Sequence, residues 1–129
     1  MKNVMTFLVT IGLFAFLVTS CGGNSGSGDK AKETKKEMTS NLDNGKVIYN
    51  KACIACHWKG VAGAAALTDK PRWEEIAAKG METLLHDAIN GYQGDYGVMP
   101  AKGTCTDCSD QDLYDAISYM IKEAGVTAK

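Results

Sequence analysis

The sequence lacks several features that would place it in other classes of protein. Its formal net charge at pH 7 is −1 and its basic residues form no stripe, which argues against nucleic acid as a partner. Its apolar stretch at residues 4–18 is about 15 residues long, short of the roughly 20 that a membrane-spanning helix needs. No segment alternates convincingly between apolar and polar residues, and no internal repeat is present, so we expect neither strands nor a repeat array.

The first 20 residues are typical of a cleaved export signal. Lys2 precedes the apolar stretch, and the small residues Thr19 and Ser20 stand before Cys21. The Val-Thr-Ser-Cys junction resembles that of a bacterial lipoprotein, in which Cys21 is lipidated and becomes the first mature residue. Two or more acyl chains make a lasting membrane anchor. An ordinary cleavage nearby, which would remove Cys21 or leave it as a free thiol, is the alternative.

Residues 21–41 have the composition of a linker. They are rich in Gly, Ser and Asn and then in Lys and Glu, with too few large apolar residues to form a core. About 20 residues of flexible chain span roughly 25 Å on average. We therefore expect a lipid-anchored tether at residues 21–41, which keeps a domain at residues 42–129 near the membrane.

The domain at residues 42–129 has the pattern of short helices joined by Gly-rich loops. Helices are expected at about residues 43–53, 71–80, 81–90 and from just after Ser109 to Gly125. Asn41 or Asp43 can cap the first, and Ser109 with Asp112 can cap the last. None of these helices is long enough to be stable alone in water. The fold class predicted is all-α, with about four short helices packed around one shared apolar object.

Cys53, Cys56 and His57 form the run Cys-Ile-Ala-Cys-His, the attachment signature of c-type haem. Two thiols three positions apart can reach the two vinyl groups of one haem, and the histidine then lies under the iron as its proximal ligand. The alternative is a chance match in a redox or zinc protein. In an exported chain we favour one covalent haem c, which would also supply the shared apolar centre.

The second axial position of the iron needs a further ligand. The candidates are Met38, Met81, Met99, Met120 and His86. Met99 is favoured because a glycine-rich segment precedes it and can bring backbone close to a porphyrin. Pro100 restricts Met99 to an extended conformation, which could place the thioether against the iron.

The domain resembles the cytochrome c-five group of class I c-type cytochromes, from about residue 42 to residue 121. The shared motifs are Cys-Ile-Ala-Cys-His at 53–57, Gly-Val-Ala-Gly-Ala at 60–64, Leu-Thr-Asp-Lys at 67–70, Trp73, Gly-Met-Glu-Thr-Leu at 80–84, Ala-Ile-Asn-Gly at 88–91, Met-Pro at 99–100, Lys-Gly at 102–103 and Cys-Thr-Asp-Cys-Ser-Asp at 105–110. The resemblance implies a monohaem electron carrier in which Cys53 and Cys56 form the thioethers. His57 is then the proximal ligand and Met99 the distal one.

The resemblance also implies that Cys105 and Cys108 pair, and that Gly45 and Tyr49 pack against the last helix near Ile117 and Tyr119. A redox-active dithiol lacks the expected strand–helix context. A four-cysteine zinc site with Cys53 and Cys56 would need far more than the usual separation of about 15–20 residues, and it would leave His57 unused. A local structural bridge beside the Met99 segment is the favoured interpretation.

One position departs from the family pattern. Ala65 stands where the family commonly has a proline, whose carbonyl accepts a hydrogen bond from the N–H of the proximal histidine. A carbonyl is still available from Ala65, but the loop loses the stiffness of the proline ring. We therefore expect a looser orientation of His57, with some effect on the iron potential.

The predicted function follows from the two axial ligands. With both positions filled, no site is vacant for a substrate, so the haem exchanges single electrons across its exposed edge. We expect an electron shuttle, not an enzyme, anchored on the periplasmic side of a bacterial membrane between a membrane-associated reductase and a terminal oxidase or reductase. The alternatives are a haem-bearing subunit of a larger oxidoreductase, or a haem sensor or enzyme if Met99 is displaceable.

Overall fold

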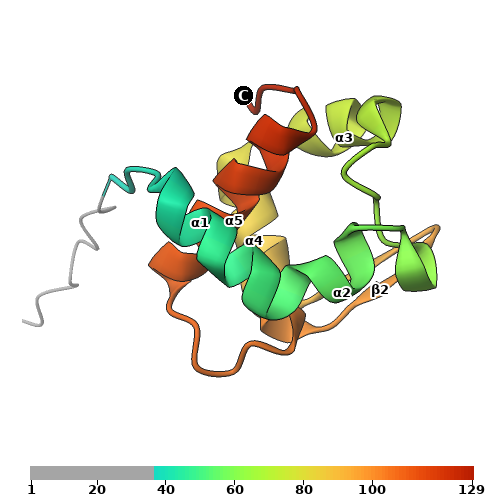
Figure 1. Cartoon of the computed structure of the whole chain (residues 1–129). Helices are drawn as coiled ribbons and strands as arrows, with labels where there is room; N and C mark the ends of the chain where they lie inside the picture. Colours follow the sequence, from blue (N-terminus) through green and yellow to red (C-terminus); the bar gives the residue numbers. More distant parts are fainter. Residues whose placement is uncertain (1–36) are drawn as a thin grey trace, which may run out of the picture. The chain divides into compact units, whose positions relative to one another are not determined.

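The computed structural model describes residues 37–129, which Figure 1 draws in colour. The predicted signal, Cys21 and most of the predicted tether lie outside the described residues. Among residues 37–129, no helix combines the length and the apolar character that crossing a bilayer requires.

The first helical segment carries the Cys-Ile-Ala-Cys-His run at its end. It starts as α1, Leu42–Ile48, passes through a π-helical turn at Tyr49–Cys53, and ends as α2, Ile54–His57. The Asn41 side chain caps it by accepting hydrogen bonds from the backbone N–H groups of Asp43 and Asn44, both at 3.1 Å. The predicted helix at residues 43–53 is thus confirmed, and it runs on to His57.

Three further helices complete the helical part, at α3 (Lys70–Ala77), α4 (Met81–Asn90) and α5 (Asp110–Glu123). They agree with the predicted helices within about three residues, and glycines at positive φ stand directly before α4 and after it. Ser109 and Asp112 form a full capping box at the start of α5. The all-α class is therefore confirmed, because the structure is mainly helical.

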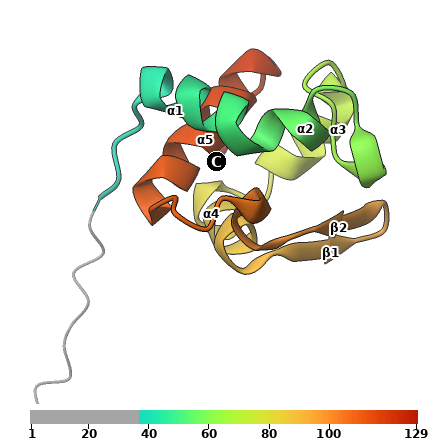
Figure 2. The ribbon, with the colours of Figure 1, turned by 60° about the horizontal axis from the view of Figure 1, so that its bottom comes forward.

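A small hairpin lies between α4 and α5, where we expected no strand. β1, Tyr92–Gly94, pairs antiparallel with β2, Gly97–Met99, so that Tyr92 stands opposite Met99. Asp95 and Tyr96 form the turn. The expectation was wrong because each strand has only three residues, one of them a glycine, and is too short to show alternation. We call residues 92–99 the Met99 hairpin; in Figure 2 it extends from α4 toward the side of α2 and α3.

α1 and α5 cross in close contact, as both views show, and Gly45 of α1 faces the α5 backbone there. A Cβ atom added to Gly45 would lie 2.7 Å from the carbonyl carbon of Asp115 and 2.9 Å from Cβ of Tyr119. One turn later, the rings of Tyr49 and Tyr119 pack with centroids 5.4 Å apart. The apolar side of α5 fills the centre of the domain with Leu113, Ala116, Ile117, Met120 and Ile121.

The same crossing holds a buried carboxylate. Asp115 is 2% exposed. It accepts hydrogen bonds from the Asn41 backbone N–H at 2.9 Å, the Asn44 amide at 2.8 Å and the Gln111 amide at 2.9 Å. Three donors satisfy a buried charge that would otherwise be costly. Because two of these donors come from the start of the first helical segment, Asp115 fixes where α1 begins on α5.

Replacing Gly45 with alanine should destabilise the domain. The added methyl group has no room against the α5 backbone, and overpacking of this kind costs about 1–3 kcal/mol. We expect the free energy of unfolding, measured by denaturant titration, to decrease by an amount near the upper end of that range. Lys46→Ala, at an exposed position next to it, is the matched control and should change stability by less than about 0.5 kcal/mol. Equal stability of the two variants would contradict the close crossing.

Asp112 should make stability depend on pH. The hydrogen bonds from the Asn44 amide and from Ser109 hold the pKa of Asp112 below its ordinary value of 3.8. The folded state thus favours the carboxylate, so its stabilisation is present above that value and is lost as the pH falls through the lower folded pKa. Asp112→Asn should reduce stability by about 1 kcal/mol at pH 7, and the gap to the unmodified protein should close below pH ~3.8. Asp110→Asn, in the same helical turn, is the control. A stability difference between Asp112→Asn and the unmodified protein that stays constant down to pH ~2 would refute the role of the charge.

Candidate haem site

The two cysteines of the Cys-Ile-Ala-Cys-His run are free thiols on the wall of one cavity. Cys53 is buried and Cys56 is half-buried, and neither takes part in a disulfide. Burial raises the pKa of the Cys53 thiol to about 11, so this thiol is neutral at pH 7. The helical turn from Cys53 to His57 thus presents two thiols and an imidazole to the same space.

His57 is held by the loop that follows α2. Its Nδ1 lies 2.9 Å from the carbonyl oxygen of Ala65. A carbonyl only accepts, so Nδ1 carries the ring proton and donates it, which leaves the lone pair on Nε2 for a metal. Burial lowers the pKa of His57, which also favours the neutral ring that binds metals. The expected carbonyl of Ala65 is therefore in place.

The loop around Ala65 has two further restraints. The backbone N–H of Leu67 donates to the carbonyl of His57 at 2.9 Å. The indole Nε1–H of Trp73 donates to the carbonyl of Ala66 at 2.8 Å, and the Trp73 ring lies 5.9 Å from the imidazole, centroid to centroid. The chain directly after the Ala65 carbonyl is thus held by two hydrogen bonds, without a proline at position 65.

The cavity has a volume of about 420 Å³, within the range of cofactor sites. Most of its wall is apolar, and the wall includes residues of α2, the loop that follows it, α3, α4, α5 and the Met99 hairpin: Ala55, Ala65, Trp73, Ile76, Leu84, Ala88, Val98, Ile117 and Met120. A mainly apolar space with two thiols and an imidazole with a free Nε2 on its wall fits a covalently bound haem.

The structure separates the five candidates for the second axial ligand. Met99 is half-buried at the end of β2 and lines the cavity, with its Cε 3.8 Å from a Cβ built on Gly103. Met120 also lines the cavity, but it belongs to the packed core of α5. Met38, Met81 and His86 do not line it. The structure therefore brings Met99 to the same space as Cys53, Cys56 and His57.

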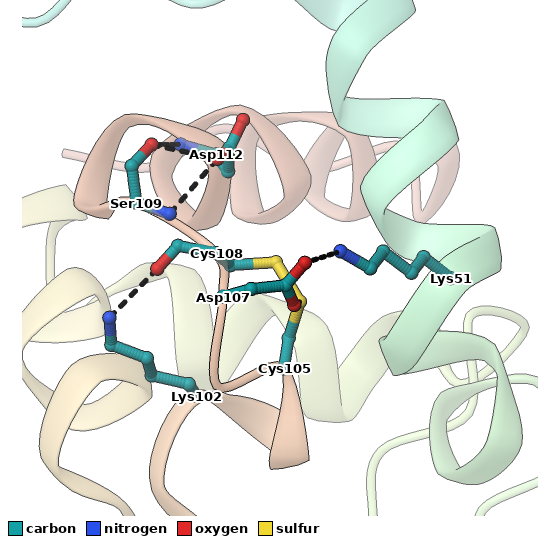
Figure 3. Close-up of polar contacts among 7 residues, drawn as sticks. All are labelled: Lys51, Lys102, Cys105, Asp107, Cys108, Ser109 and Asp112. Atoms are coloured by element: carbon teal, nitrogen blue, oxygen red, sulfur yellow. Dashed lines mark hydrogen bonds and ion pairs between the residues drawn. A yellow bond between two sulfur atoms is a disulfide. The ribbon is translucent and has the colours of Figure 1, made fainter.

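The segment after Met99 is tied down at several points, which Figure 3 shows. Cys105 and Cys108 are joined by a disulfide. Lys102 Nζ donates to the Cys108 carbonyl at 2.7 Å, and Lys51 forms an ion pair of 2.7 Å with Asp107. The Lys51 ammonium holds the pKa of Asp107 below its ordinary value. Within residues 37–129, the group that could hold a metal ion at Cys105 and Cys108 includes the carboxylate of Asp107. Cys53 and Cys56 are not part of this group, so the zinc alternative gains no support.

Arg72 and Lys79 also line the cavity, and sequence reasoning did not single them out. The Arg72 guanidinium lies 4.0 Å from the ring of Tyr96, and Lys79 Nζ lies 4.0 Å from the ring of Tyr92. These pairs are 24 and 13 positions apart in the sequence, so no local pattern indicates them.

The sequence and structure were compared with those of known proteins. Residues 40–120 match the family model described as cytochrome c oxidase, cbb3-type, subunit III. Cytochrome c-555 of Chlorobaculum tepidum is 39% identical over 80 residues, which cover 62% of this chain and 74% of the relative. Cytochrome c5 of Ectopseudomonas mendocina is 44% identical over 75 residues, covering 57% of this chain and 82% of the relative.

Two solved structures are similar as well. A chain from the crystal structure of an electron transfer complex of nitrite reductase with cytochrome c has a TM-score of 0.57 and 32% identity, covering 67% of this chain and 99% of the other. A mono-heme ferrocytochrome c from Shewanella putrefaciens has a TM-score of 0.50 and 40% identity, covering 63% of this chain and 95% of the other. The chain therefore belongs to the class I monohaem c-type cytochromes, which are small electron carriers that bind haem c covalently.

Proposed function

We propose that Cys53 and Cys56 hold the haem by thioether bonds, and that His57 Nε2 and the Met99 sulfur bind its iron. The observation that supports this is the shared cavity, whose wall carries two free thiols, a correctly protonated imidazole and a thioether. When bound, the haem supplies reversible one-electron exchange between ferric and ferrous iron. The protein's part is to hold both faces, to exclude water and to set the balance between the two oxidation states.

The residues around the ligands act on that balance. The Ala65 carbonyl makes His57 a stronger electron donor by accepting a hydrogen bond from its Nδ1–H. A methionine thioether favours ferrous iron and raises the potential relative to a second histidine. Since protein groups fill both axial positions, no substrate can bind to the iron, and the function is electron transfer without catalysis.

The surface at the mouth of the cavity suits brief contact with another redox protein. Val61, Tyr96 and Val98 line the cavity and are still exposed, with Val98 at 63%. Trp58, just after α2, is 60% exposed. Exposed apolar residues around a redox centre suit an interaction surface, and electron-transfer encounters are usually small. We propose redox proteins as partners, a class supported by the similar chain in a complex with nitrite reductase.

We further propose that the protein is exported and works at the periplasmic side of a bacterial membrane, held there by lipid on Cys21. The support is the sequence of residues 1–21 alone. A tether at residues 21–41 would let the domain move between a membrane-associated reductase and a terminal oxidase or reductase.

Met99→Ala should keep the covalent haem and lose the distal sulfur ligand. The thioether bonds depend on Cys53 and Cys56, so haem should stay with the denatured polypeptide. The far-red sulfur-to-iron absorption of the oxidised protein should disappear, and the potential in an optical redox titration should fall. Met120→Leu, a substitution of similar volume at the other cavity methionine, is the control and should keep the band. A band that survives in Met99→Ala and vanishes in Met120→Leu would reassign the ligand.

The mature N-terminus should begin at Cys21 and carry acyl chains. Intact mass and peptide mass spectrometry of protein purified from membranes with detergent measure this directly. Two or more chains give a lasting anchor, so the protein should stay with the membrane after a high-salt wash. An unmodified N-terminus in a protein that the wash releases would overturn the anchor and leave the haem assignment untouched.

A further inference from the structure

The Met99 hairpin cannot be held in place by its own pairing. Its strands have three residues each, and a short two-stranded hairpin is at best marginally stable in water. Tyr96 at its turn is 66% exposed, and Tyr92 and Val98 are exposed as well. Contacts from other elements must therefore keep Met99 at the cavity wall.

Arg72 of α3 binds the tip of the hairpin. Its guanidinium donates a hydrogen bond of 2.6 Å to the Gly63 carbonyl and lies 4.0 Å from the Tyr96 ring. The two backbones meet under this side chain, because a Cβ built on Gly63 would lie 2.6 Å from the Tyr96 carbonyl carbon. Arg72 thus covers the junction between the turn at Val61–Gly63 and the tip of the hairpin.

Lys79 binds the base of the hairpin in a similar way. Its Nζ lies 4.0 Å from the ring of Tyr92 and forms an ion pair with Asp87 of α4. Tyr92 stands opposite Met99 in the strand register. Two cations, one in α3 and one just after it, therefore contact the two tyrosines of the hairpin.

We propose that Arg72 is a positioning residue that clamps the Met99 hairpin to the His57 side of the cavity, with Lys79 as a second clamp at the hairpin base. The turn at Val61–Gly63 leads within two residues to Ala65, the partner of His57. Arg72 accordingly joins the segments that carry the two sides of the site. This inference rests on the proposed role of Met99 as distal ligand: release of the clamp withdraws the thioether and opens the iron.

The planar guanidinium suits this task better than an ammonium. It can donate to a carbonyl along one edge while its face lies on an aromatic ring. Arg72→Lys should therefore restore only part of the effect of Arg72→Gln. Tyr96→Phe keeps the ring and should behave as the unmodified protein, whereas Tyr96→Leu removes it.

The test measures how often the hairpin opens in the full haem-containing protein. Two readouts serve: amide hydrogen exchange of residues 92–99, and the rate of carbon monoxide binding to the ferrous protein. Tyr96→Leu loses one cation–ring contact, which should raise the open population about fivefold. Arg72→Gln also loses the charged hydrogen bond, which should raise the open population about tenfold or more. Both readouts should rise together while the unfolding midpoint changes little in Tyr96→Leu, since its side chain is exposed.

Lys59→Gln is the matched control. Lys59 Nζ lies 5.4 Å from the Trp58 ring, a contact of the same kind that touches no part of the hairpin. Its loss should leave both readouts unchanged. If Arg72→Gln and Tyr96→Leu also match the unmodified protein, the clamp does not exist; an effect of Arg72→Gln alone would overturn the ring contact.

The outcomes separate the clamp from the proposed function. An unmodified protein without the far-red band would refute Met99 ligation, yet hydrogen exchange of the hairpin would still report on the clamp. A normal band with unchanged exchange in both variants would refute the clamp and leave the ligand assignment standing.

Discussion

The close crossing of α1 and α5 determines where Cys53, Cys56 and His57 lie. Gly45 lets the first helical segment approach the α5 backbone, and the buried carboxylate of Asp115 fixes its start. The segment then runs without interruption through a π-helical turn to His57, so the position of its first turn sets the position of its last. A π-helical turn changes the rotation along a helix, and such turns are frequent at functional sites. The crossing and the turn together direct Cys53, Cys56 and His57 to the cavity.

The two sides of the cavity are built differently. The His57 side is a helix end with a backbone-bound imidazole, packed against the buried ring of Trp73. The Met99 side is a three-residue strand whose neighbours are mostly exposed. Its restraint comes from outside: the disulfide segment with its Lys102 and Lys51 contacts follows it, and the cations Arg72 and Lys79 lie on its tyrosines. Local opening should therefore begin on the Met99 side, where few apolar contacts resist it.

The sequence allows prediction of the parts that depend on neighbouring residues. The helix at residues 81–90, the cap at Ser109 and the Cys-Ile-Ala-Cys-His run are patterns within about ten residues, and the structure contains all of them. The hairpin was missed because three-residue strands show no period. The contacts of Arg72 with Tyr96 and of Asp115 with Asn44 were missed because they join distant segments. Neither a surface arginine nor an aspartate in a helix is unusual alone, so only the fold shows what each one binds.

The loop around Ala65 is restrained by hydrogen bonds from outside it as well as within it. A proline at this position would stiffen the loop by its ring alone. Here the loop is fixed by hydrogen bonds from Trp73 to the Ala66 carbonyl, from Leu67 to the His57 carbonyl, and from Arg72 to the Gly63 carbonyl. Two of these donors belong to α3, and one of them also contacts the hairpin. A ring would stiffen only its own loop, whereas these bonds make the orientation of His57 depend on the packing of α3. The loop that carries the Ala65 carbonyl is therefore restrained by the packing of α3, and a looser imidazole stays a prediction.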